Sequence, residues 1–180
     1  MPKWLGSTLN PDIIVPRVDQ WKAQWHRVIR WHRRIADVQA KSASTELDVN
    51  DIDFVIAFFQ NCYHLRDWLK ACRPDLSSQL DLLFSDNFEM AACRDICNGF
   101  KHKTLNNRPL DADFTLYREY DYFAKIEGSQ SPIKYRAAFA DGDDVRKFDI
   151  FALAQRCFQL WEQFISNALN YSAADVSSFL

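Results

Sequence analysis

The chain has 180 residues and a mass of 21.1 kDa, which is room for one domain and excludes a multidomain enzyme. A hydrophobic share of 48% and a charged share of 26% are typical of a globular protein, and 4 glycines and 6 prolines are too few for collagen, low-complexity sequence or glycine-rich phosphate loops. The net charge of -2 gives no global attraction to nucleic acid or anionic membranes, so any site for a polyanion must be local.

One segment near the start of the sequence is strongly basic. Residues 17–41 contain seven basic and two acidic side chains, a net charge of +5. Such a segment is most often a solvated helix face, and the alternative is a surface that binds phosphate or an acidic partner. The basic residues are Arg17, Lys22, Arg27, Arg30, Arg33, Arg34 and Lys41.

Three tryptophans lie in the same segment as these arginines. Core packing behind a basic outer face is the favoured interpretation, and stacking of nucleic-acid bases beside the arginines is the alternative. The three residues are Trp21, Trp25 and Trp31.

Helices are predicted along most of the chain. Three prolines mark residues 1–16 as an extended lead-in, and an amphipathic helix is expected to follow Pro16 directly. A single domain is predicted for residues 17–170, and residues 171–180 are predicted to be a loose tail. Further helices are expected from the N-cap Asn50 to Cys72, from about Leu76 to Phe84, from the caps Ser85-Asp86-Asn87 to His102, and from about Asp149 to Leu169.

The sequence pattern changes before the last helix. From Leu110 onward, apolar and polar residues alternate, which indicates strands. We expect a β-hairpin at about residues 112–149, with enough sequence for a third strand. The predicted fold class is therefore mainly α: a helical bundle of four to five helices with a β-hairpin insertion before the last helix.

The five cysteines are odd in number, irregularly spaced and placed in predicted helices, which argues against a disulfide framework. We interpret them as buried thiols of a reduced, cytoplasmic protein. The alternative is that Cys93 and Cys97, which are four residues apart, form half of a metal site. We expect no metal and no cofactor. No signal peptide and no apolar run of membrane-spanning length is present, so no membrane association is expected.

No motif of high specificity is present: the sequence has no GxGxxG, phosphate loop, HExxH, paired CxxC or GxSxG pattern. The candidate chemistry lies instead in two polar clusters on helices that otherwise form core. The first cluster contains His64, Arg66 and Asp67, and the second contains Arg94, Asn98, Lys101 and His102.

The second cluster lies on one side of its predicted helix because its members are about three or four residues apart. If the two helices pack antiparallel, the clusters meet and form a cleft with two imidazoles, a carboxylate and several cations. Such a cleft can hold a phosphodiester and move a proton. The alternative is a structural network, with a His64–Asp67 pair on one helix and with Lys101 and His102 at the negative end of the other helix dipole.

The segment Cys97-Asn98-Gly99-Phe100-Lys101-His102 resembles the Arg-Asn-x-x-x-His signature of the HEPN (higher eukaryotes and prokaryotes nucleotide-binding) superfamily. The match is at Asn98 and His102. Cysteine stands at the position of the signature arginine, and Arg94 lies one turn earlier on the same face. The chain resembles a divergent member of this superfamily, and the resemblance extends over residues 17–104 and the final helix.

This resemblance implies a nucleic-acid-associated protein, and specifically a metal-independent ribonuclease of toxin or defence type. It also implies RNA as a substrate, a homodimer and an antitoxin-type partner. The alternative function is a non-catalytic helical module that binds a protein partner or a small ligand. The resemblance makes His102 the general acid and base, lets Asn98 and Arg94 position the phosphate, and leaves His64, Arg66, Asp67 and Lys101 to contact the substrate.

Overall fold

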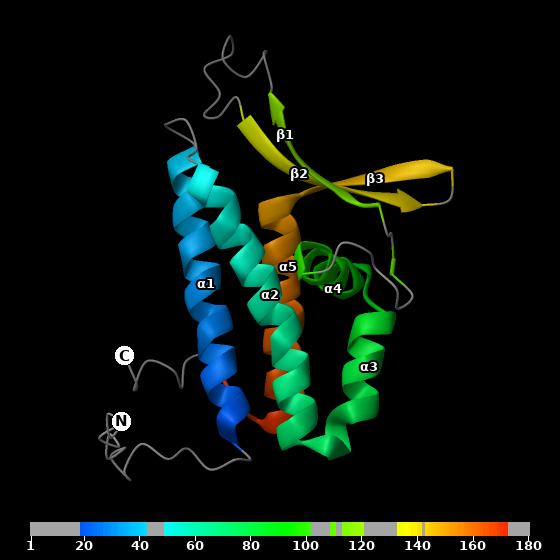
Figure 1. The fold of residues 1–180 in the computed structure, drawn as a ribbon. Coiled ribbons are helices and arrows are strands. Elements are labelled where there is room, and N and C mark those ends of the chain that lie inside the picture. Colours follow the sequence, from blue (N-terminus) through cyan, green and yellow to red (C-terminus); the bar gives the residue numbers. More distant parts are fainter. Residues whose placement is uncertain are drawn as a thin grey trace, which may run out of the picture.

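A computed structural model of the chain describes residues 19–42, 49–101, 109–110, 113–120, 133–141 and 143–172. Figure 1 shows a bundle of helices with a small antiparallel sheet across one end. The predicted fold class, mainly α with a β-insertion before the last helix, is confirmed, and the insertion has three strands. The predicted lead-in, residues 1–16, and residues 173–180 of the predicted tail lie outside the described residues.

The first two helices form an antiparallel pair, α1 (Gln20–Ser42) and α2 (Val49–Cys72). The helix α2 starts one residue before the predicted N-cap Asn50, so that prediction is wrong. Asp51 nevertheless lies in the first turn, where its charge favours the helix dipole. Three- and four-residue spacing correctly identified the core face of α1, whose buried residues are Trp21, Trp25, Val28, Ile29, Ile35 and Val38.

A polar contact joins α1 and α2 inside this apolar interface. The buried Gln24 amide donates from Nε2 to the backbone oxygen of Asn61 at 3.1 Å and to its side-chain Oδ1 at 3.0 Å. The Asn61 amide donates in turn to the carbonyl of Ala57 at 2.7 Å. Because buried polar groups are costly when unpaired, these bonds favour one alignment of the two helices.

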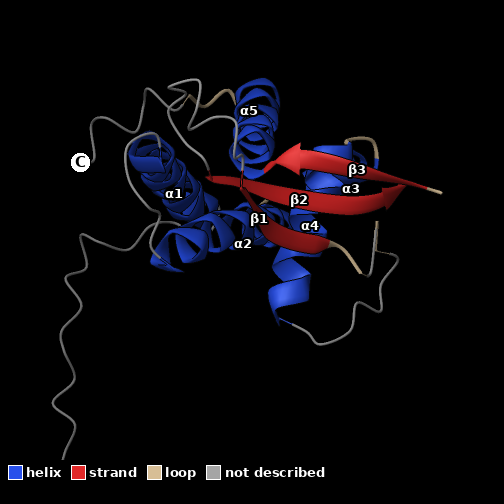
Figure 2. Cartoon of the chain, turned by 90° about the horizontal axis from the view of Figure 1, so that it is seen from above, coloured by secondary structure: helices blue, strands red, loops and turns tan. Residues whose placement is uncertain are grey.

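The next elements are the short 3-10 helix η3 (Pro74–Leu76), then α3 (Ser77–Ser85) and α4 (Phe88–Lys101). Figure 1 shows α3 running antiparallel to α2, whereas α4 is seen nearly end-on and therefore lies across the upright helices. Figure 2, viewed at a right angle to Figure 1, shows the same crossing. The middle of α4 is buried almost all round, at Met90, Ala92, Cys93, Ile96 and Cys97.

The last helix, α5 (Ile150–Leu169), packs against α1 through aromatic rings. The Phe158 ring is stacked on Trp25, with centroids 5.3 Å apart, and on His32, with centroids 4.0 Å apart. After α5 the chain returns to the start of α1, where Tyr171 meets Trp21 edge to face at 5.4 Å. Helices α1 and α5 therefore contact each other along much of their length, in opposite directions.

The sheet has the order β1 (Thr115–Tyr120), β2 (Ile133–Asp141), β3 (Asp144–Asp149), with both pairs antiparallel. Alternate residues of β2 face the bundle, so Tyr135, Ala137 and Phe139 are buried. Phe139 contacts Phe88 of α4 edge to face, at a centroid distance of 5.7 Å. Figure 2 shows the sheet lying over the ends of the helices.

In the described part of the chain, none of the helices is both long enough and apolar enough to cross a membrane.

Asp149 joins the sheet to the last helix and gives a direct test of the fold. Its carboxylate Oδ1 accepts hydrogen bonds from the amides of Phe151 at 3.0 Å and Ala152 at 3.1 Å, as an N-cap does. We expect Asp149→Ala to lower the free energy of unfolding by about 1 kcal/mol, and Asp149→Asn to retain most of the stability because Asn also caps helices. Urea denaturation of both variants measures this difference, and equal losses would show that the cap is not what Asp149 contributes.

Candidate functional site

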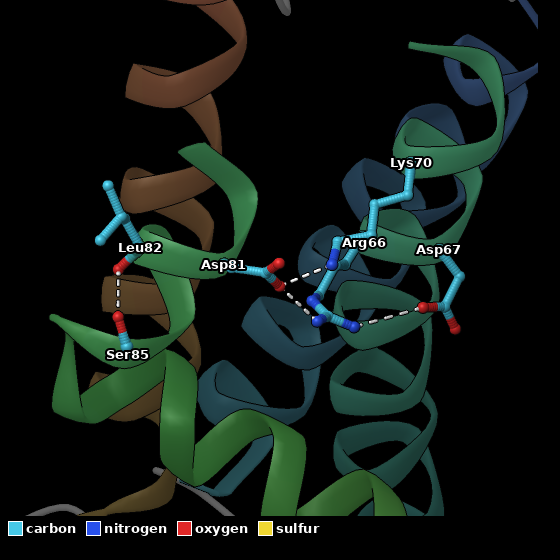
Figure 3. Close-up of polar contacts among 6 residues, drawn as sticks. All are labelled: Arg66, Asp67, Lys70, Asp81, Leu82 and Ser85. Atoms are coloured by element: carbon cyan, nitrogen blue, oxygen red, sulfur yellow. Dashed lines mark hydrogen bonds and ion pairs between the residues drawn. The ribbon is translucent and has the colours of Figure 1, made fainter. Parts of the chain in front are cut away.

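The polar cluster on α2 connects to α3. Figure 3 shows Arg66 and Lys70 converging on Asp81, with nitrogen-to-oxygen distances of 2.5 Å and 2.6 Å. Hydrogen bonds from Lys70 and then from Arg66 hold the pKa of the Asp81 carboxyl below its usual value. The Arg66 guanidinium is therefore already neutralised by a carboxylate, and a substrate phosphate would have to compete with Asp81 for it.

His64 and Asp67 do not form the pair that the structural alternative predicts. Asp67 is exposed and its carboxylate lies 3.6 Å from Arg66 instead. His64 is half-buried, and the described residues give it no hydrogen bond or ion pair. No described hydrogen bond or ion pair links His64, Arg66 or Asp67 to α4, because α4 crosses α2 rather than running antiparallel beside it.

The cluster on α4 is organised around a buried carboxylate that sequence analysis gave no role. Asp95 is only 1% exposed, and its Oδ1 accepts a hydrogen bond from Arg94 Nε at 2.8 Å. The other oxygen of Asp95 accepts from the backbone amide of Leu110. Asp95 therefore fixes both the Arg94 guanidinium and the chain that leads into β1. The one signal in the sequence was an acidic residue between apolar helix positions.

The end of α4 holds the remaining predicted residues. Asn98 is half-buried, and Lys101 is the last residue of the helix, although its side chain lies outside the description. His102, the predicted catalytic residue, also lies outside the described residues. On the other side of this helix end, Ile96 is buried, whereas Phe100 is 50% exposed.

Gly99 allows an aromatic ring to pack directly on α4. A Cβ at this position would lie 2.6 Å from the ring of Phe114, which stacks on Phe139 at 5.6 Å. A side chain at position 99 would push Phe114 away from Phe139. The neighbour that needs a glycine at this position is therefore Phe114, a residue of the same protein.

The cysteines form a buried thiol group. Cys62, Cys93 and Cys157 come from α2, α4 and α5, and burial is the main cause that raises the pKa of each thiol. Cys93 donates to the carbonyl of Phe59, and Cys157 donates to that of Glu89. Within the described ranges, no group of three or more side chains could hold a metal ion, so the metal alternative at Cys93 and Cys97 gains no support.

The outward face of α1 is the largest group of cations without a described carboxylate partner. Arg27, Arg30, Arg33 and Arg34 are exposed, and among the described residues none of them has a carboxylate within ion-pair distance. Trp31 is half-buried beside them, and the guanidinium carbon of Arg34 lies 4.5 Å from the centre of its ring. Core packing is confirmed for Trp21 and Trp25, which are buried, and base stacking by those two residues is excluded.

Two histidines of α1 are bonded to α5 and to the residues that follow it. His26 hydrogen-bonds the Tyr171 hydroxyl at 3.0 Å, and His32 hydrogen-bonds Gln155 at 2.7 Å. Burial, followed by the positive charges of Arg30 and Lys22, lowers the pKa of His26, and burial lowers the pKa of His32. The lowered pKa values favour the neutral form of both rings, so the positive charge of this face comes mainly from its arginines.

The described residues thus contain two separate polar groups on α2 and α4 and a basic face on α1. Comparison of the chain with family models, with curated proteins and with solved structures finds no match. Function has to be inferred from the residues of this chain alone.

Removal of the Asp95 carboxylate tests whether the α4 cluster is structural. Asp95→Ala leaves the buried amide of Leu110 and the Arg94 guanidinium without their acceptor, so we expect the free energy of unfolding to fall by about 2–3 kcal/mol. Asp67→Ala is the matched control, because it removes an exposed carboxylate that also pairs with an arginine, and its cost should stay below about 0.5 kcal/mol. Urea denaturation measures the free energy of unfolding of both variants. Similar losses of stability in the two would refute the anchoring role of Asp95.

Proposed function

We propose that this protein binds nucleic acid through the outward face of α1. The observation that carries this proposal is the set of four exposed arginines on one helix without described carboxylate partners. Arginine matches phosphate geometry with paired donors, and clustered arginines on one face are the electrostatic footprint of polyanion binding.

The distribution of charge over the whole chain supports the same partner. Residues 17–41 carry +5, and the rest of the sequence carries -7. A polyanion is repelled by most of this protein and attracted at one place, so it would be oriented as it binds. An acidic protein partner would meet the same charges, but the arginine-on-tryptophan contact at Arg34 adds a planar element that favours nucleic-acid bases.

The dependence of binding on salt tests this proposal. Arg30→Ala combined with Arg33→Ala should weaken binding of a labelled RNA and lower the slope of log K against log salt by about 1.5, because two phosphate contacts are lost. The matched control, Arg118→Ala combined with Lys147→Ala, removes two exposed cations outside α1 and should leave the slope unchanged. Fluorescence anisotropy over a salt series measures both. Equal effects in the two variants would refute α1 as the binding face.

A second candidate function is the HEPN-like ribonuclease that the resemblance implies. The observation in its favour is Asn98, which is half-buried in the last turn of α4 and has no described hydrogen-bond partner. Arg94 is held by Asp95, so in this candidate Asn98 and Lys101 would contact the phosphate and His102 would transfer the proton. The homodimer and the antitoxin-type partner belong to this candidate, and a non-catalytic binding module is its alternative.

Cleavage of RNA by wild type and His102→Ala separates these candidates. Purified protein is incubated with total RNA in excess EDTA, and we expect the ribonuclease to cleave and His102→Ala to be inactive with an unchanged melting temperature. Persistent cleavage by folded His102→Ala would remove His102 from the mechanism. If wild-type protein binds RNA without cleaving it, the ribonuclease candidate is removed and RNA binding is the remaining function.

A cytoplasmic location is also part of the proposal. It is supported by the five cysteines, which are all free thiols although three of them lie together in the core.

A further inference from the structure

The pair Trp31 and Arg34 gives the basic face of α1 a planar cation at a fixed place. The Trp31 ring packs against Phe54 of α2, at a centroid distance of 5.9 Å, which holds it at the rim of the interface between the two helices. The guanidinium carbon of Arg34 lies 4.5 Å from the centre of the Trp31 ring. Arg34 is exposed, so the guanidinium is supported on one side by the indole and accessible to solvent.

Three other cations of the described residues lie over aromatic rings, and none of them belongs to the group of exposed arginines on α1. Arg146 lies over Phe88 at 5.0 Å, but it is part of β3. Arg66 also lies over aromatic rings, but its guanidinium is bound to Asp81 at 2.5 Å. Lys22 lies over Tyr171, but its ammonium is bound to Asp19 at 2.8 Å and has no plane. Arg34 combines a planar cation, an aromatic support and no described carboxylate partner.

We infer that Arg34, supported by Trp31, stacks on an unpaired base of a single-stranded nucleic acid. This inference rests on the proposed function and names its substrate class. Bases in a duplex have both faces covered by neighbouring bases, whereas bases of a single strand can turn out and stack on aromatic or guanidinium planes. Arg30 and Arg27 lie on the same side of α1, one and two turns before Arg34, where they can reach phosphates of the same strand.

Exchange of arginine for lysine isolates the stacking contribution. Lysine keeps the charge but has no plane to stack, so phosphate attraction is preserved in the variant. Arg156→Lys is the matched control, because Arg156 is an exposed helical arginine outside the basic face of α1 and no ring contact of Arg156 is described. The probes are a labelled RNA strand of about 12 nucleotides without internal pairing, DNA of the same sequence, and the blunt duplex of the same length.

We expect Arg34→Lys to weaken binding of at least one single strand by about fivefold or more and binding of the duplex by less than about twofold, in anisotropy titrations at one salt concentration. Arg156→Lys should change each affinity by less than about twofold. The two single strands show whether the polymer is RNA or DNA, and either result supports the inference. Melting temperatures confirm that both variants are folded.

Two results would overturn the inference and are distinguishable from failure of the proposed function. Equal small effects of Arg34→Lys and Arg156→Lys on every probe would show that α1 binds phosphate without stacking a base. Displacement of the single strand by poly-glutamate at equal charge concentration, in wild type and Arg34→Lys alike, would identify an acidic polypeptide as the better partner. Failure of wild type to bind any nucleic-acid probe would overturn the proposed function together with the inference.

Discussion

The stacking of Phe158 on Trp25 and His32 fixes the orientation of α1. Both rings of α1 lie on one side of the helix, seven residues apart, so contact with a single ring of α5 sets the rotation of α1 about its axis. Because that side is buried against α2 and α5, the opposite side of α1, which carries the arginines, is exposed to solvent. The basic surface is therefore a consequence of how the aromatic core packs, and its charges need no further contact to hold them outward.

The buried carboxylate of Asp95 changes the interpretation of the polar residues on α4. A charge with 1% exposure is stable inside a protein only when its hydrogen bonds are satisfied, and Arg94 together with the amide of Leu110 supplies them. Arg94 is therefore part of the support of the fold. The largest group of exposed guanidiniums that the structure describes lies on α1 instead, on the far side of α2 from this cluster.

Those features that depend on local spacing could be predicted from the sequence. The core of α1 follows from apolar residues every three or four positions, and the turn from sheet to α5 follows from Asp149 ahead of an apolar run. Exposure of Phe100 at the end of α4 could not be predicted in the same way, because it depends on where the neighbouring elements stop covering the helix.

The relation between the two polar clusters could not be predicted either. It depends on the crossing of α4 over α2, which is set by contacts of α4 with the sheet and with α5 that are distant in sequence. The role of Asp95 was missed for the same reason, because its partner Leu110 lies 15 residues away and donates a backbone amide, which leaves no trace in the side-chain pattern.

Tyr171 gives the bundle an unusual mechanical property. The chain leaves α5 beside the start of α1, with the Tyr171 ring against Trp21 and its hydroxyl bonded to His26. A force that pulls these two ends of the domain apart would load the contacts between α1 and α5 one after another, starting at Tyr171 and reaching Phe158 later. Separation of antiparallel helices in this peeling geometry needs less force than sliding them past each other, so the domain should yield from this end while the α2–α4 crossing is still intact.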